Sequence, residues 1–214
     1  MLGNLQDHNE HRRVSTCKGL INRCHSLYCP FCSNGKTSRL LGRVRGACHT
    51  LPERRRENLK YVTFTCSDVP IQDLRDTAHA LMQAGRQTFK RLDVPGHISR
   101  LEISSKGWHN FHPHVHAVVD FATGGRGYVS KAAFTHAWTS ALPADLRAPE
   151  SGVHIESVDN LAEATSYLCE SNFHKFIREK NRVAIEEVSR TVEAITALHG
   201  LRKFTSRGTL ALSN

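Results

Sequence analysis

Residues 111–121 follow an alternating pattern of side chains, and this pattern restricts the fold more than any other feature of the chain. Histidines occupy positions 112, 114 and 116, and valine or alanine fills positions 115, 117 and 119. Neighbouring side chains of a β-strand point to opposite faces of the sheet. The run therefore predicts a strand with one face against an apolar core and the other face carrying a row of histidines.

The same kinds of periodicity recur along the chain and give an order of elements. Strands are predicted at 59–65, 97–104, 111–121 and 152–158, and helices at 71–92, 130–142 and 159–176. The order β-α-β-β-α-β is that of the split βαβ unit. We therefore expect an α+β fold, a ferredoxin-like (RRM-like) antiparallel sheet with its helices on one face, followed by a last helix at about 183–199.

The row of histidines predicts a metal site. His114 and His116 present two imidazoles from one face of a rigid strand, which favours metal binding. The strand at 97–104 precedes them by a short turn, and a hairpin brings Glu102 to the same face. Two imidazoles and one carboxylate with open positions favour Mn or Mg, and the histidines favour Mn. We predict that His114, His116 and Glu102 hold a catalytic divalent metal.

The helix predicted at 159–176 carries a second group of interest. Glu163, Tyr167 and Glu170 fall on one of its faces by a spacing of three to four residues, and an apolar stripe occupies another face. A helical tyrosine is usually a packing residue. In the split βαβ layout, however, this helix lies near the strands that carry the histidines. Tyr167, with Glu163 one turn earlier, is therefore a candidate catalytic residue.

Positive charge is concentrated near the N-terminus. Residues 1–60 contain 12 Lys and Arg against 4 Asp and Glu, whereas residues 61–214 contain 17 against 16. Such a concentration indicates a nucleic-acid partner, although a solvated basic tail has the same composition. We expect the DNA contacts to include Arg39, Arg43 and Arg100.

The length of the chain allows one sizeable core and an appendage. We predict a basic Cys-rich zinc-binding segment at 1–58 and a catalytic domain at 59–214. No stretch reaches the roughly 18 apolar residues of a membrane span. The polar N-terminus does not look like a secretory signal, so we expect a cytoplasmic protein without a membrane partner.

Four of the seven cysteines crowd into sixteen residues near the N-terminus. In a cytoplasmic chain this crowding indicates metal rather than disulfides. Cys29 and Cys32 have the spacing of a zinc knuckle, and four thiolates favour tetrahedral zinc. We predict a structural zinc held by Cys17, Cys24, Cys29 and Cys32. His11, His25 and Cys48 are alternatives to Cys17 or Cys24, and free or packed cysteines are the other reading.

Five segments of the chain, taken together, match a known pattern. They are Tyr61–Thr65, then Gly96–Glu102 leading to His112–His116, then Glu163 with Tyr167, and in addition Cys24–Cys32 and Leu198–Gly208. The first three resemble the three motifs of plasmid rolling-circle replication initiators (Rep proteins), within the HUH endonuclease superfamily. The other two resemble the Cys motif and the C-terminal end of these proteins. The resemblance covers most of residues 17–210.

The resemblance implies an enzyme that nicks and joins single-stranded or hairpin origin DNA. Tyr167 would attack the scissile phosphate, giving a 5′-phosphotyrosine and a free 3′-hydroxyl for a polymerase, and Glu163 would activate water to end the cycle. The divalent metal would polarise the phosphate. Because the chain has no helicase P-loop, a host helicase and polymerase are implied as partners. The sequence does not give the oligomeric state.

One position departs from the family. Glu170 stands where members usually carry a lysine three residues after the tyrosine, and a carboxylate repels a phosphate where an ammonium attracts it. Two other functions stay open. An HUH transposase or relaxase would use similar chemistry, although relaxases commonly place the tyrosine before the histidines. A DNA-binding regulator with a weakened catalytic site would account for Glu170, and a nicking assay separates it from the enzymes.

Overall fold

A computed structural model of the chain describes residues 30–106, 110–121, 129–148, 152–169, 193–194, 196–201 and 204–212. The longer helices are α2 (Pro30–His49), α4 (Leu74–Arg91), α5 (Lys131–Ala141) and α6 (Leu161–Cys169), and α3 is short (Glu53–Arg56). The strands are β1 (Leu59–Thr65), β2 (Val69–Pro70), β3 (Gly96–Lys106), β4 (Asn110–Asp120), β5 (Val153–Ser157) and β6 (Phe204–Gly208). Across the described ranges, no helix is both long and apolar enough to cross a membrane.

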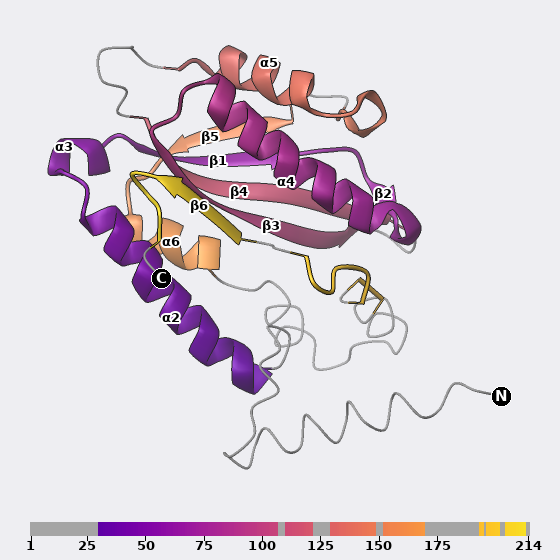
Figure 1. The fold of residues 1–214 in the computed structure, drawn as a ribbon, viewed down its shortest axis with the longest axis horizontal. Coiled ribbons are helices and arrows are strands. Elements are labelled where there is room, and N and C mark those ends of the chain that lie inside the picture. The colour runs from indigo at the N-terminus through magenta and orange to yellow at the C-terminus, as the bar shows by residue number, and fades with distance from the viewer. Residues whose placement is uncertain are drawn as a thin grey trace.

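The strands form one antiparallel sheet in the order β5-β1-β4-β3-β6, and β2 pairs with β4 (Figure 1). The α+β class is as predicted, and the order β-α-β-β-α-β is present as β1, α4, β3, β4, α5 and β5. β3 and β4 form the expected hairpin; β3 is longer than expected, and β4 is shifted by one residue. β6 was not predicted, and it extends the sheet at the β3 edge. The predicted helix at 183–199 falls mostly outside the described residues.

α4 and α5 cover one face of the sheet. α4 is amphipathic, and its apolar side packs on β4 and on the inward side chains of β1. Phe64 of β1 is fully buried there, with its ring 4.5 Å from that of Trp138 and 5.5 Å from that of Phe89. The Trp138 indole also donates a hydrogen bond to the backbone carbonyl of Thr65. These contacts fix β1 and β4 from the side opposite the histidines.

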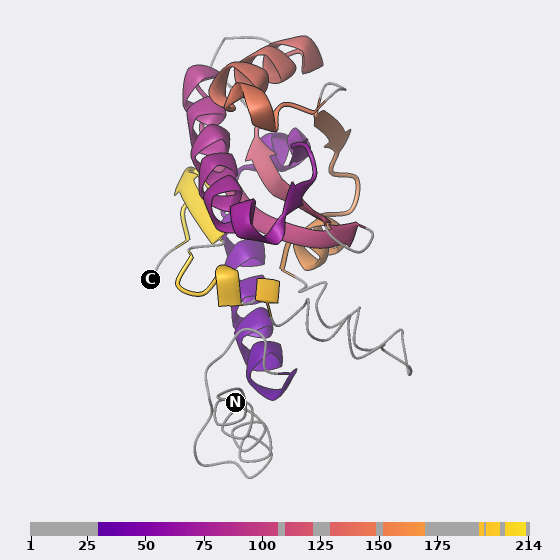
Figure 2. The ribbon, with the colours of Figure 1, turned by 90° about the vertical axis from the view of Figure 1, so that its right-hand side faces the viewer.

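α2 and α6 cover the other face of the sheet, so the prediction of helices on one face alone is wrong (Figures 1 and 2). The reason lies in β4, where Val118 and Val119 are neighbours and both are fully buried. A strand with apolar side chains on both faces must be covered on both. Val44 of α2 and Leu168 of α6 are buried in this second core with Val118.

The segment 50–58, at the end of the predicted Cys-rich segment, contains α3 and is tied to the sheet. Arg55 of α3 forms an ion pair with Asp120 at the end of β4. Asp120 is fully buried and also accepts a hydrogen bond from the hydroxyl of Thr209, at 2.6 Å. Leu51 and Leu59, on either side of α3, both lie in the second core. The chain just before β1 therefore packs as part of the same body as the sheet.

Candidate active site

β4 and its two neighbours bring the predicted metal ligands together. In the register of the sheet, His114 lies opposite Glu102 of β3 and opposite Thr65 of β1. His116 lies opposite Thr63 of β1. Because alternate residues share a face, these side chains all point toward the side of the sheet that carries α6. The hairpin therefore places Glu102 beside the histidines, as its position in the sequence predicted.

His116 is held from two sides. Its Nε2 donates a hydrogen bond to Glu102 Oε2 at 3.0 Å, and its Nδ1 lies 3.2 Å from the hydroxyl of Thr63. Burial acts to raise the pKa of the Glu102 carboxyl. The hydrogen bond with His116 and the electrostatic interactions with His116, Arg100 and His114 outweigh burial, so the pKa lies below its ordinary value. Glu102 is therefore an anion at neutral pH.

His114 lies beside this pair and differs from His116 in its hydrogen bonding. Its Nε2 is 3.2 Å from the hydroxyl of Ser104, and its Nδ1 is buried with no hydrogen-bond partner among the described residues. Burial, together with His112 and His116, lowers the pKa of His114 to about 4. The ring is therefore neutral at pH 7, which is the form that binds metals. Farther out, His112 Nδ1 lies 2.5 Å from a carboxylate oxygen of Asp68.

The donor atoms suit a divalent metal, but their arrangement is that of a hydrogen-bonded cluster. Two imidazoles and an ionised carboxylate are neighbours, and one buried imidazole nitrogen has no partner in the described part of the chain. Yet the residues that the structure describes contain no group of three His, Cys, Asp or Glu side chains set around one point. Instead, Glu102 hydrogen-bonds His116 directly, and His114 lies against Ser104. The metal therefore stays a prediction.

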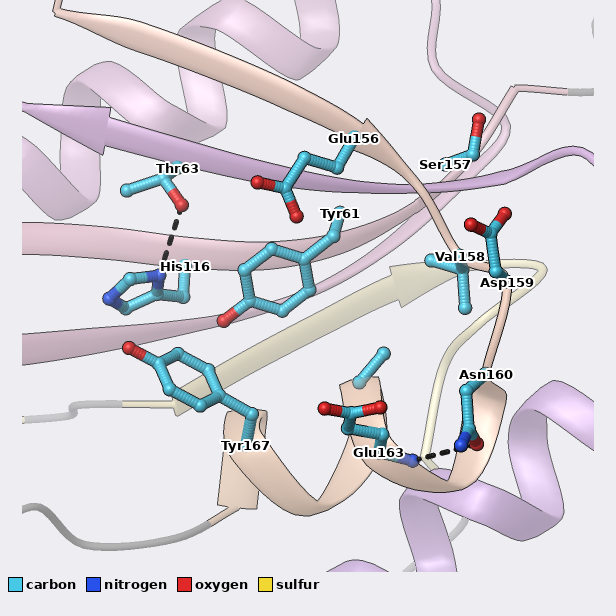
Figure 3. A pocket seen from close by; sticks show the side chains of 11 residues that line it. Tyr61, Thr63, His116, Glu156, Ser157, Val158, Asp159, Asn160, Glu163 and Tyr167 are labelled. Atoms are coloured by element: carbon cyan, nitrogen blue, oxygen red, sulfur yellow. Dashed lines mark hydrogen bonds between the residues drawn. The ribbon is translucent and has the colours of Figure 1, made fainter.

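A pocket of about 430 Å³ opens beside His116, between β1, the end of β5 and α6 (Figure 3). Tyr61 and Tyr167 both line it, and Figure 3 shows their hydroxyl groups pointing toward His116. The Tyr167 ring lies 5.5 Å from the His116 ring and 5.9 Å from the Tyr61 ring, each in an edge-to-face arrangement. The fold thus places the predicted nucleophile next to the predicted metal ligands.

The two tyrosines differ in their access to solvent. The Tyr61 hydroxyl is buried and has no hydrogen-bond partner among the described residues. Burial, with the nearby Tyr167 and Glu102, raises the pKa of Tyr61 well above its ordinary value. Tyr167 is 43% exposed. Ionisation of Tyr61 is therefore disfavoured, and of these two side chains Tyr167 is the one open to solvent.

The start of α6 sets the place of Glu163. The side-chain oxygen of Asn160 accepts a hydrogen bond from the Glu163 N–H at 3.1 Å, so Asn160 caps the helix. Glu163 lies in the first turn, is exposed and lines the pocket one turn before Tyr167 (Figure 3). Both predicted catalytic residues therefore face the same pocket.

The predicted DNA contacts are in different environments. Arg39 and Arg43 are exposed on α2. Arg100 is half-buried, and its guanidinium donates a hydrogen bond to the backbone carbonyl of Leu168 at 3.1 Å. Glu170, the departure from the family, lies outside the described residues.

The predicted zinc site falls almost entirely outside the described part of the chain. Cys17, Cys24 and Cys29 lie outside it, as does the side chain of Cys32, whose backbone belongs to α2. Cys48, one of the alternative ligands, is buried in the second core. Burial there raises the pKa of its thiol to about 11, so it is a neutral packing residue.

Sequence reasoning assigned no role to Tyr61 and Thr63, although both belong to the first motif. Their alternation with Val62 and Phe64 places them on the polar face of β1. The pairing of β1 with β4 adds that this face meets His116. The signal was therefore present, but it needed the strand order.

A family model described as a replication protein (Rep_1) matches residues 19–211. No curated protein and no solved structure gives a significant match. The matched range contains β1, β3, β4 and α6, and so includes every described residue of the candidate site.

Proposed function

Because the chain belongs to the replication protein family (Rep_1) of plasmid rolling-circle initiators, we propose that it nicks and rejoins single-stranded origin DNA with Tyr167 as the nucleophile. The observation that carries this proposal is the position of Tyr167, on the wall of a pocket with its ring 5.5 Å from that of His116. Membership of the family implies that origin DNA is bound. A host helicase and polymerase would then unwind and extend the nicked strand.

The proposed cleavage is one transfer of a phosphoryl group. Tyr167 Oη attacks the phosphorus and forms a new O–P bond, while the bond from phosphorus to the 3′ oxygen breaks. The phenol proton passes to a carboxylate or water in the pocket, and the departing 3′ oxygen takes up a proton to become a hydroxyl. Rejoining is the reverse step. In the closing hydrolysis, Glu163 takes a proton from the water that attacks phosphorus, the bond from phosphorus to Tyr167 Oη breaks, and the released tyrosine oxygen takes up a proton.

His114, His116 and Glu102 are the residues that would hold the divalent metal, Mn or Mg. The bound metal would supply positive charge to the phosphate oxygens on which negative charge develops. Thr63 and Ser104 hydrogen-bond the two imidazoles and so orient their rings. Glu102 is already ionised at neutral pH, so no proton has to leave it before a cation binds.

We also propose that a structural zinc is held by Cys17, Cys24, Cys29 and Cys32. The segment around this zinc would bind DNA together with Arg39 and Arg43. The support is the cysteine spacing and the concentration of positive charge in residues 1–60. Elemental analysis should find about one zinc per chain, reduced in Cys29→Ser. A fully folded wild-type protein that contains no zinc would overturn this part of the proposal.

The nucleophile can be tested without knowing the origin. The protein is incubated with Mn and a pool of randomised single-stranded oligonucleotides, and protein-linked DNA is recovered under denaturing conditions and sequenced. We expect one preferred cleavage sequence, a covalent adduct with the wild type, and none with Tyr167→Phe. Tyr61→Phe is the matched control, because it removes a tyrosine hydroxyl from the same pocket. This variant should still form the adduct.

Other outcomes separate the alternatives. Glu163→Gln should accumulate adduct, because the closing hydrolysis is slowed while the first transfer is retained. A wild-type protein that binds the origin but never forms an adduct would favour the DNA-binding regulator. An adduct that survives Tyr167→Phe would exclude Tyr167 as the nucleophile.

A further inference from the structure

The helix that carries Tyr167 is held in place by its contacts with the rest of the protein. Nine residues of α6 are described, and most of the stability of a helix in a protein comes from tertiary packing rather than from the helix itself. The Tyr167 side chain is 43% exposed, so burial does not fix its ring. The distance between Tyr167 and His116 is therefore set by the contacts that fix α6 against the rest of the protein.

Arg45 of α2 donates hydrogen bonds to three residues of α6. Its Nη2 donates to the hydroxyl of Ser166 at 3.0 Å and to the backbone carbonyl of Ala162 at 3.1 Å. Its Nε lies 3.3 Å from the hydroxyl of Thr165, which is fully buried. The planar guanidinium thus bridges two successive turns of α6 and ends at the residue before Tyr167. A planar fork with several donors suits such a set of acceptors, whereas the single ammonium of a lysine does not.

A second arginine holds α6 on the other side of Tyr167. Arg100 of β3 donates from Nη1 to the carbonyl of Leu168, the residue after Tyr167. The side chains of Leu168 and Cys169 are buried in the second core. Arg45 and Arg100 therefore reach α6 from two different elements, at positions that flank the tyrosine in sequence.

We propose that Arg45 is a positioning residue for Tyr167, and that with Arg100 it fixes α6 so that the tyrosine hydroxyl meets His116. This inference rests on the proposed function of Tyr167. The hydrogen-bond partners of Arg45, which are Ala162, Thr165 and Ser166, do not line the pocket, so Arg45 acts through the helix. The same helix α2 carries the exposed Arg39 and Arg43, so α2 joins the proposed DNA contacts to the element that bears the nucleophile.

Single-turnover adduct formation tests this role. Arg45→Ala should slow adduct formation at saturating DNA by about 10- to 100-fold, because a misplacement of about 1 Å can cost a factor of this size. The DNA concentration for half-saturation should change by less than about twofold, since the residue is assigned no contact with DNA. Arg45→Lys should recover part of the rate. Arg86→Ala, which removes an exposed arginine of α4 on the opposite face of the sheet, is the control for charge and should keep the wild-type rate.

Two further measurements keep the test independent of stability. If Arg45 acts through Ser166, then Ser166→Ala should slow the reaction less than Arg45→Ala, and the two changes together should cost less than the product of their single effects. With fluorotyrosine incorporated, the ¹⁹F resonance that Tyr167→Phe removes should shift in folded Arg45→Ala and stay in place in Arg86→Ala.

The possible failures are distinguishable. A wild-type protein that forms no adduct would overturn the proposed function, and this inference with it. A wild-type protein that forms the adduct, with Arg45→Ala equally fast and its Tyr167 resonance unmoved, would overturn the role of Arg45 alone. A loss confined to DNA affinity would also overturn it, since Arg45 would then be a DNA contact.

Discussion

Replacing His97 by phenylalanine should make the protein more resistant to acid. His97 belongs to the second sequence motif, but it lies on the face of β3 opposite to Glu102, in the core under α4. It is 4% exposed, its ring stacks on that of Phe89 with centroids 4.2 Å apart, and its Nε2 has no hydrogen-bond partner among the described residues. Burial, with the charge of Arg207 on the paired strand β6, lowers the pKa of His97 to about 4.

The direction of the effect follows from proton binding in the two states. In the unfolded chain His97 takes up a proton near its ordinary pKa of 6.5, whereas in the folded protein it does so only near 4. Between these values the unfolded state binds more protons, so stability is lost as the pH falls from 6.5 to 4 and the loss is complete below 4. The two pKa values differ by about 2.5, and each pKa unit corresponds to about 1.4 kcal/mol, so the folded protein loses about 3 kcal/mol of stability by pH 4.

Urea unfolding between pH 4 and pH 8, in the presence of EDTA, measures this effect. The free energy of unfolding of His97→Phe, taken relative to the wild type, should be constant above pH 7.5 and rise by about 3 kcal/mol by pH 4. His79→Gln, which removes an exposed histidine of α4, should follow the wild-type curve. A difference between His97→Phe and wild type that does not change with pH would refute the assignment of a buried neutral imidazole.

Three other outcomes follow from the structure. Arg55→Ala should lower the free energy of unfolding in urea by about 2 to 4 kcal/mol, because the fully buried Asp120 loses its ion pair with Arg55. Arg54→Ala, which removes an exposed arginine of the same helix, should change the free energy of unfolding by less than about 0.5 kcal/mol. Gly208→Ala should lower the melting temperature by at least about 5 °C, since Gly208 has φ +62° and a Cβ there would lie 1.9 Å from the Pro95 carbonyl oxygen. Gly42→Ala is the control and should not lower the melting temperature, because a Cβ at Gly42 has no atom within 4 Å. EDTA should stop adduct formation and Mn should restore it in the wild type but not in His116→Ala, and an adduct formed at full rate in EDTA would exclude the catalytic metal.

The parts of the fold that the sequence predicts well are those that depend on neighbours along the chain. The alternation at 111–121 predicts both the strand β4 and the face that carries His114 and His116. The short connection to the preceding strand predicts the hairpin, and with it the approach of Glu102. Period and spacing determine these features directly, so no distant part of the chain has to be known.

The parts that were missed depend on contacts between distant segments. β6 is a run of polar and half-buried residues, and it joins the sheet through backbone pairing with β3 rather than through an apolar pattern. Arg45 looks in sequence like any arginine of a basic helix, because the groups it binds lie 117 to 121 residues away. α2 and α6 cover the second face of the sheet because Val118 and Val119 are adjacent and need cover on both faces. This apolar pair is visible in the sequence, but a sheet with helices on one face was assumed.

The most direct test of the central claim is to identify the amino acid that is joined to DNA. The wild-type protein is trapped with cleaved single-stranded DNA and digested with nuclease and trypsin, and the peptides are examined by mass spectrometry. The tryptic peptide of residues 148–175 contains Tyr167 as its one tyrosine, and that of residues 61–75 contains Tyr61. We expect a 5′-phosphonucleotide on Tyr167 in the first peptide. A nucleotide on Tyr61, or cleaved DNA with no linked peptide, would contradict the account.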